Sequence, residues 1–257
     1  MQVRAWLELM RLSNLPTVWS NLLHGLAAGT FVAWSQIPPG LRPGPLPTSV
    51  GFYFDQGFVL LIGVSLIYIA GMIFNDVADA NEDLRDRPTR AIPSGRVNRR
   101  AAAVAATVAA AVGITCSTAF HEPLVLQGTI ALVACAAAYD LLPHRSLTGL
   151  VLLPTCRVLA FAIGAVAFAG SARIESIFTL HLGLPALLLA GWTLAITLTA
   201  RAEVKHHGRP RLVGWMIAGF GLIDAAGLFW IGMPQLATAC VALGILTVVG
   251  QRWIPGS

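Results

Sequence analysis

The chain has 257 residues, of which 56% are hydrophobic and only 11% are charged, and this composition excludes an ordinary soluble domain. The four cysteines all lie inside apolar stretches without CxxC spacing, which argues against a disulfide or metal framework. The net charge of +5 is not accompanied by a pattern of base-stacking aromatic residues, so we expect no nucleic-acid partner.

Apolar runs long enough to cross about 30 Å of hydrocarbon recur along the whole chain. The sequence therefore predicts an all-α polytopic membrane protein, with residues 1–257 forming one domain of eight or nine transmembrane helices. Eight runs are apparent, namely Leu15–Trp34, Gly57–Phe74, Ala101–Phe120, Pro123–Tyr139, Leu147–Gly170, Phe178–Ala200, Leu212–Ile231 and Pro234–Gly250.

Residues 1–14 mix apolar and charged side chains and predict a short amphipathic segment in the membrane interface. In the first span Asn14, Asn21 and His24 are spaced to lie near one stripe of a helix. Such a stripe either faces a substrate cavity or forms hydrogen bonds to neighbouring helices, and the sequence leaves both interpretations open. The Pro- and Gly-rich residues 35–56 predict a loop on the outer face.

An acidic motif follows the second apolar run. Asn75, Asp79 and Asp83 are four residues apart, and Asp76 precedes Asp79 by three, so a helix would place all four near one face. Carboxylates crowded beside lipid repel one another, and a divalent cation would relieve that repulsion. Mg²⁺ takes one or two carboxylates and uses substrate phosphates as further ligands. The motif therefore predicts a Mg²⁺ site formed by the three aspartates.

Arginines follow the aspartates directly. Arg85, Arg87 and Arg90 could supply the planar donor forks that bind phosphate oxygens. The alternative is a solvated loop of mixed charge at the end of a helix, but the position beside a membrane span favours a site for a metal diphosphate.

Two further polar segments end on the same side of the membrane, because they also follow even-numbered spans. One begins with Tyr139 and Asp140 and the other ends the sixth span. Three converging segments predict the mouth of a lipid-accessible central cavity that opens to the cytoplasm. The remaining polar residues of these two segments are His144, Arg145, Arg201, Glu203 and Lys205.

Basic residues support this orientation. Fourteen of the 17 Lys and Arg residues fall on the side that would be cytoplasmic, and only Arg42 and Arg173 fall on the other. We expect a multi-pass protein of the cytoplasmic membrane with both termini and the three polar segments in the cytoplasm.

The stretch NDVADANEDLRDRPTRAIPSG, from Asn75 to Gly95, resembles the first motif of the UbiA superfamily of intramembrane prenyltransferases. The first-span sequence RLSNLPTVWSNLLHG is also similar to first helices of that superfamily. This resemblance implies a helical bundle that uses Mg²⁺ to transfer a prenyl group from an isoprenyl diphosphate to a small acceptor. It also implies that Asp76, Asp79 and Asp83 bind the metal and are catalytic.

The chain departs from the superfamily pattern in several places. Pro143 stands where a lysine would follow Tyr139 by four residues. We expect Tyr139 itself to orient the diphosphate or to stabilise a cation through its ring. Thr199 and Glu203 stand where a second aspartate motif, DxxxD, would be, and no ninth span is evident. The sequence from Cys156 to Gly164 is similar to the EboC-like branch of the superfamily.

Two charges lie inside spans. Arg157, halfway along the fifth span, is costly in lipid unless paired, by about 2.5–3.5 kcal/mol, so it predicts a contact with Asp140, with a substrate anion or with a structural partner. For Asp224, in the seventh span, we expect the role of a structural partner and no catalytic role.

The reading from the sequence is thus a Mg²⁺-dependent prenyltransferase in contact with membrane lipid. A terpene cyclase of the same fold, and a non-catalytic isoprenoid or lipid carrier, remain alternatives. Acceptor identity and prenyl length are left open. The residues expected to contact substrate are Asn14, Asn21, Asn75, Arg87, Arg90, Asp140, His144, Arg145, Arg157, Arg201, Glu203 and Lys205.

Overall fold

A computed structural model of the chain describes residues 2–142, 147–169, 180–206 and 211–254. Over these ranges the backbone is helical and contains no strand. The elements in chain order are α1 (Gln2–Leu9), the short 3₁₀ helix η1 (Leu12–Asn14), α2 (Leu15–Ser35), η2 (Pro39–Leu41), α3 (Val50–Ala78), α4 (Ala80–Asp86), α5 (Arg99–Ser117), α6 (Pro123–Leu141), α7 (Leu147–Ala169), α8 (Leu180–His206), α9 (Arg211–Ala218), α10 (Phe220–Trp230) and α11 (Pro234–Trp253).

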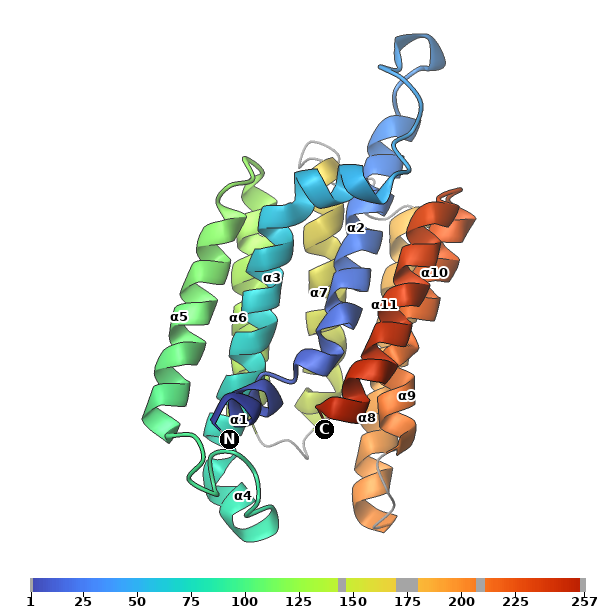
Figure 1. The fold of residues 1–257 in the computed structure, drawn as a ribbon. Helices are drawn as coiled ribbons and strands as arrows, with labels where there is room; N and C mark the ends of the chain where they lie inside the picture. The colour runs from blue at the N-terminus through green and yellow to red at the C-terminus, as the bar shows by residue number, and fades with distance from the viewer. Residues whose placement is uncertain (1, 143–146, 170–179, 207–210, 255–257) are drawn as a thin grey trace.

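Seven helical stretches within the described ranges are long and apolar enough to cross a membrane. They correspond to the last seven of the eight predicted spans, and α9 and α10 together form one of them. Helix α2, the remaining predicted span, runs among them through the middle of the bundle (Figure 1). The structure thus confirms the predicted all-α, polytopic class.

Helix α2 differs from the other spans in its surroundings. Fourteen of its 21 residues are buried, and it packs against α3, α7, α8, α10 and α11. Because protein rather than lipid surrounds most of its surface, α2 can carry polar side chains that a lipid-facing helix could not. This position brings Asn14, Asn21 and His24 into contact with several other helices.

Small residues allow α2 and α7 to cross closely. A Cβ atom added at Gly25 would collide with the carbonyl oxygen of Phe161, and one at Gly29 would collide with that of Ala165. The two glycines form a GxxxG pair, which lets helix backbones approach within a membrane. This close crossing fixes α7, and with it Arg157, against the polar side of α2.

Side-chain caps fix where two of the spans begin. The Asn98 side chain accepts hydrogen bonds from the amides of Arg100 (2.9 Å) and Ala101 (3.2 Å) at the start of α5. The Ser49 hydroxyl accepts one from the Phe52 amide at the start of α3. Both caps satisfy amides that a helix leaves unpaired in its first turn. The cap at Asn98 also closes the loop 87–98, which carries Arg90.

The N-terminal helix is amphipathic, as predicted. Ala5 and Leu9 of α1 are fully buried against Ile73 of α3 and residues of the loop 87–98. Helix α1, helix α4 and the last turn of α11 lie at the same end of the bundle (Figure 1). This packing holds the residues that follow α1 beside the acidic motif.

Candidate active site

The acidic motif lies where α3 ends and α4 begins. Asp79 is the residue between the two helices, so the single continuous helix expected from the sequence is interrupted there. The interruption is slight, because the Asp79 amide donates to the Asn75 carbonyl oxygen and the Asp83 amide to that of Asp79, both at 2.9 Å. The i to i+4 ladder therefore continues, and Asp76 and Asp83 keep a common face.

Arg90 joins those two aspartates. Its Nη1 atom lies 2.9 Å from Asp83 Oδ2 and 3.4 Å from Asp76 Oδ1. Both aspartates are buried, and Arg90 comes from the loop after α4, as the sequence predicts for an arginine near the motif. One guanidinium nitrogen thus lies between two buried carboxylates.

Arg11 completes the site, and the sequence did not single it out for this role. Its Nη2 atom donates to Asp76 Oδ1 at 3.0 Å and to Asn75 Oδ1 at 3.2 Å. Arg11 adopts a left-handed backbone (φ 46°) between α1 and η1, and Tyr68 donates to its carbonyl oxygen at 3.3 Å. No sequence signal identifies this residue, because the contact depends on how α1 docks against α3.

Helix α6 contributes the predicted neighbour of the motif. Asn75 donates from Nδ2 to Asp140 Oδ1 at 3.0 Å, which links the ends of α3 and α6. Tyr139 directly precedes Asp140 in the last turn of α6. Two of the three predicted polar segments therefore meet at one end of the bundle. Helix α8, which carries Arg201 of the third segment, ends on the same side (Figure 1).

The other predicted residues divide into three groups. Arg87 is exposed at the end of α4. Glu203 and Lys205 lie on α8, but the structure does not describe their side chains. His144 and Arg145 lie outside the described residues. For all five, contact with substrate stays a prediction.

A polar cavity of about 220 Å³ opens beside Asp76. It is bounded by α1, the end of α3 and the loop 87–98. Three arginines and two carboxylates line it, and a loop arginine, Arg96, closes one wall by donating to Glu8 Oε2 at 2.9 Å. The arginines are donors suited to phosphate oxygens. The charged lining is Glu8, Arg11, Asp76, Arg90 and Arg96.

The carboxylates of the acidic motif are candidate metal ligands. Across the parts of the chain that the structure describes, no three His, Cys, Asp or Glu side chains are grouped closely enough to hold a metal ion, and the three-aspartate site stays a prediction. Asp76 and Asp83, however, already share one cationic nitrogen, that of Arg90. Since Mg²⁺ needs only one or two carboxylates from a protein, the donor set fits that ion.

The hydrogen-bond partners of Arg157 differ from the expected pairing with Asp140. It is not paired with Asp140; its Nη1 atom lies 2.6 Å from Asn21 Oδ1 and 3.2 Å from the Thr17 carbonyl oxygen, and Nη2 donates to Thr17 Oγ1 at 3.0 Å. The guanidinium also stacks 4.1 Å from the centre of the Phe220 ring. Asp140 instead accepts a hydrogen bond from Asn75 of α3.

Asp224 has the structural partners that the sequence predicted. It is fully buried and accepts from Ser20 Oγ at 2.7 Å and from Asn21 Nδ2 at 2.9 Å. His24 Nδ1 lies 3.0 Å from its other oxygen. We call Thr17, Ser20, Asn21, His24, Arg157 and Asp224 the buried polar network.

The polar stripe of α2 therefore forms hydrogen bonds to neighbouring helices. Asn21 and His24 contact α10, and Asn14 accepts from Gln251 of α11 at 2.9 Å. These contacts support the interpretation that the stripe forms hydrogen bonds between helices. A substrate contact for Asn14 or Asn21 stays a prediction.

Fold and site together define a polytopic helical membrane protein with buried carboxylates and arginines at one end of its bundle. Residues 44–254 match the model of the UbiA prenyltransferase family, and the chain belongs to that family. This match confirms the resemblance drawn from the acidic motif.

Two relatives come from archaea. The chain is 31% identical over 205 residues to the digeranylgeranylglyceryl phosphate synthase of Methanosarcina mazei, a match that covers 79% of this chain and 64% of the relative. It is 28% identical over 181 residues to the synthase of Sulfurisphaera tokodaii, covering 69% of this chain and 58% of that one. The chain thus spans less than two thirds of the length of these relatives.

Solved structures share the fold. A UbiA homologue from Archaeoglobus fulgidus bound to DMAPP and Mg²⁺ superposes with a TM-score of 0.54 at 15% identity, covering 95% of this chain and 86% of that one. A digeranylgeranylglyceryl phosphate synthase structure gives a TM-score of 0.54 at 12% identity, covering 98% and 95%. At these identities the likeness concerns the fold.

Proposed function

We propose that this chain is an intramembrane prenyltransferase, which moves a prenyl group from an isoprenyl diphosphate to a small acceptor and releases pyrophosphate. The observation that carries the proposal is the meeting of two buried carboxylates, Asp76 and Asp83, with the guanidinium groups of Arg11 and Arg90. Carboxylates are ligands for a divalent cation and arginines bind phosphate oxygens. One end of the bundle can therefore hold both parts of a metal diphosphate.

The residues divide the work as follows. Asp76 and Asp83, with Asp79 as the third predicted ligand, would hold Mg²⁺, which when bound supplies positive charge that stabilises the leaving diphosphate. Arg11 and Arg90 would turn from the carboxylates to donate hydrogen bonds to the diphosphate oxygens. Such preorganised donors stabilise charge that develops in the transition state.

The reaction breaks the C1–O bond of the prenyl diphosphate, and the electron pair leaves with pyrophosphate. The acceptor's nucleophilic atom then donates an electron pair to C1 and loses its proton. The allylic cation in between must be kept from water, which the apolar interior of the bundle would do. We assign Tyr139 to the end of this interior that lies beside the acidic motif, where its ring can stabilise the cation.

Cationic residues would take over part of a second metal ion's role. Thr199 and Glu203 stand where the superfamily has DxxxD, and Arg201 and Lys205 flank them. Support comes from the Thr199 hydroxyl, which bonds to the Ala195 carbonyl oxygen of its own helix at 2.9 Å. We therefore propose that one Mg²⁺ is held at the first motif and that Arg201 contributes charge opposite it.

Arg157 is proposed as an anion-binding residue for the substrate. It is only half buried, and three of its hydrogen bonds hold it in one orientation. The names of the archaeal relatives describe a prenylated glyceryl phosphate as product. A glyceryl phosphate lipid is therefore the first acceptor class to test.

We further propose that this end of the bundle faces the cytoplasm. The acidic motif, α1 and the end of α11 share that end (Figure 1). In the sequence, fourteen of the 17 Lys and Arg residues belong to the segments expected on that side. Such a bias is typical of cytoplasmic segments.

Pyrophosphate release by the purified chain tests the proposal. It should require Mg²⁺, an isoprenyl diphosphate and an acceptor, and the product should contain both organic parts. Release without an acceptor, giving a cyclic hydrocarbon, would identify a terpene cyclase. Tight binding of the diphosphate without any release would identify a carrier.

A further inference from the structure

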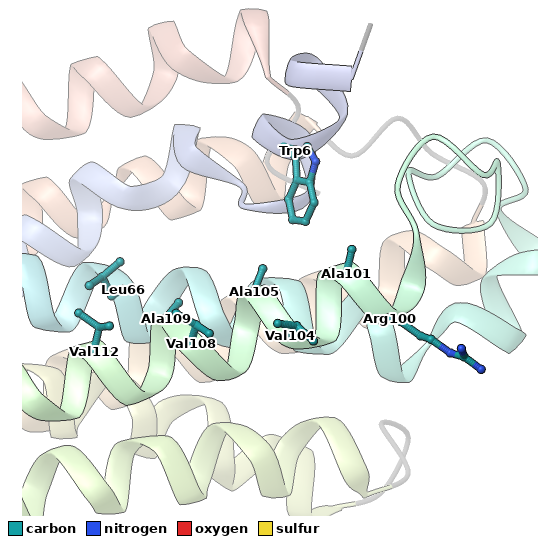
Figure 2. A pocket seen from close by; sticks show the side chains of 9 residues that line it. All are labelled: Trp6, Leu66, Arg100, Ala101, Val104, Ala105, Val108, Ala109 and Val112. Atoms are coloured by element: carbon teal, nitrogen blue, oxygen red, sulfur yellow. The ribbon is translucent and has the colours of Figure 1, made fainter.

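An apolar groove of about 720 Å³ runs along the membrane-facing side of α5 (Figure 2). Its floor is a double row of small side chains, in which each residue is four positions from the next. Two residues from other helices also line the groove. These are Leu66 of α3 and Trp6 of α1, whose ring lies over the α5 residues. The floor residues are Ala101, Val104, Ala105, Val108, Ala109 and Val112.

The groove has the dimensions of one lipid chain. Residues 100–112 of α5 rise about 18 Å along the helix axis. One leaflet of a bilayer offers about 15 Å of hydrocarbon, half of the ~30 Å core. Val104, Val108 and Val112 are 63%, 56% and 46% exposed, so protein leaves this floor uncovered. A chain lying along it would reach from the interface to the middle of the bilayer.

A cation lies at the interfacial end of the groove. Arg96, Arg99 and Arg100 all precede or begin α5, but the first two are engaged. Arg96 bonds to Glu8, and Arg99 bonds to the Val77 carbonyl oxygen at 3.1 Å. Within the described ranges the Arg100 guanidinium makes no hydrogen bond or ion pair, and it points past the end of the groove (Figure 2).

We propose that this groove is a binding site for an anionic phospholipid, with one acyl chain along α5 and the phosphate at Arg100. Trp6 serves as the interfacial wall, since indole rings favour the headgroup level of a membrane. Basic residues near that level attract anionic lipid. The site is separate from the acidic motif, and the proposal does not depend on the prenyl-transfer activity.

Native mass spectrometry of the purified full chain tests this site. The chain is incubated with equal amounts of phosphatidylglycerol and phosphatidylcholine that carry identical acyl chains. Wild type should retain phosphatidylglycerol in preference. Val108→Trp, which fills the groove, should lose both lipids, whereas Thr107→Trp, on another exposed face of the same helix, should retain them as wild type does.

The charge is tested by a matched pair. Arg100→Gln should retain the two lipids equally, whereas Arg252→Gln, which removes an exposed arginine at the same end of the bundle, should keep the preference. All four positions are exposed, so monodispersity in gel filtration should be unchanged. The proposal is overturned if Val108→Trp retains lipid like Thr107→Trp, or if the two arginine variants lose the preference equally.

Discussion

Arg157 and Asp224, on α7 and α10, are joined through the side-chain amide of Asn21 on α2. The amide oxygen lies 2.6 Å from Arg157 Nη1, and the amide nitrogen lies 2.9 Å from Asp224 Oδ2. This arrangement fixes which way the amide points, because only oxygen can accept from a guanidinium and only nitrogen can donate to a carboxylate. Two opposite charges inside the bundle are thereby satisfied across a third helix.

Removing the charge of Asp224 should destabilise the fold. In Asp224→Asn the neutral side chain keeps one acceptor oxygen in place of two for Ser20, Asn21 and His24, and a buried polar group left without its partner costs about 1–3 kcal/mol. We expect a markedly lower melting temperature in detergent. Asp55→Asn, at an exposed position of α3, is the control and should melt as wild type does. Equal melting of the two variants would mean that Asp224 does not stabilise the network.

Arg157→Met tests substrate binding. We expect the variant to raise the KM for a substrate, because a methionine retains bulk but cannot donate to an anion. The same change removes the guanidinium that bonds to Thr17 and Asn21, so stability must be separated from binding. The double variant Arg157→Met with Asp224→Asn restores neutrality. If its activity returned with its stability, Arg157 would be purely structural.

Asp76→Asn should be nearly inactive. Loss of one strong electrostatic contact to a transition state costs about 10²–10³ in rate, and Asp76 contacts both Arg11 and Arg90. Pyrophosphate release is measured across a Mg²⁺ titration. Asp86→Asn, exposed at the end of α4, should retain activity.

Replacing Glu203 tests the proposal of one tightly held metal ion. Glu203→Gln should be only mildly impaired, and Arg201→Gln should be impaired in a way that extra Mg²⁺ partly restores. Equal losses for Glu203→Gln and Asp76→Asn, with the same Mg²⁺ dependence, would argue for a second metal cluster and against the proposal.

Gly25→Val should prevent the close crossing of α2 and α7. The added Cβ collides with the Phe161 carbonyl oxygen, which is backbone and cannot move aside without shifting α7. We expect little monodisperse protein in fluorescence-detected gel filtration. Gly191→Ala is the control: space around it is open, and alanine favours a helix by about 0.5–1 kcal/mol. Normal recovery of Gly25→Val would contradict the packing.

Orientation is tested with reporter fusions. A reporter that is active only in the cytoplasm should be active when placed after Ser257 and inactive when placed in the Pro-rich loop at Gly44, because the basic bias predicts cytoplasmic ends. The same activity at both sites would mean that an even number of spans, and not the expected seven, lies between Gly44 and Ser257.

The sequence identified the helices and the acidic motif because both are local patterns. Apolar runs set seven of the spans, and the spacing from Asn75 to Asp83 placed the motif at the end of a helix. The alternation of spans across the membrane predicted that the end of α6 lies on the same side as the acidic motif, and the structure adds the contact of Asp140 with Asn75. These inferences need only chain order and helix periodicity.

Contacts between distant segments could not be predicted in this way. Arg11 reaches Asp76 only because α1 folds back onto α3, and a left-handed residue in the connection has no signature in the letters RLSN. The partner of Arg157 was likewise misjudged in part. Thr17 and Asn21 lie on α2, 140 and 136 residues away, and their distance to Arg157 depends on the glycine-lined crossing.

The placement of α2 at the centre of the bundle bears on how the protein is made. This helix leaves the ribosome before the other long helices, yet its polar partners, Arg157 and Asp224, emerge only in the second half of the chain. Until then Asn21 and His24 have nothing to bond within lipid, and that deficit weighs against stable insertion. We expect α2 to wait at the membrane surface during synthesis and to enter the bilayer as a late partner of α7 and α10.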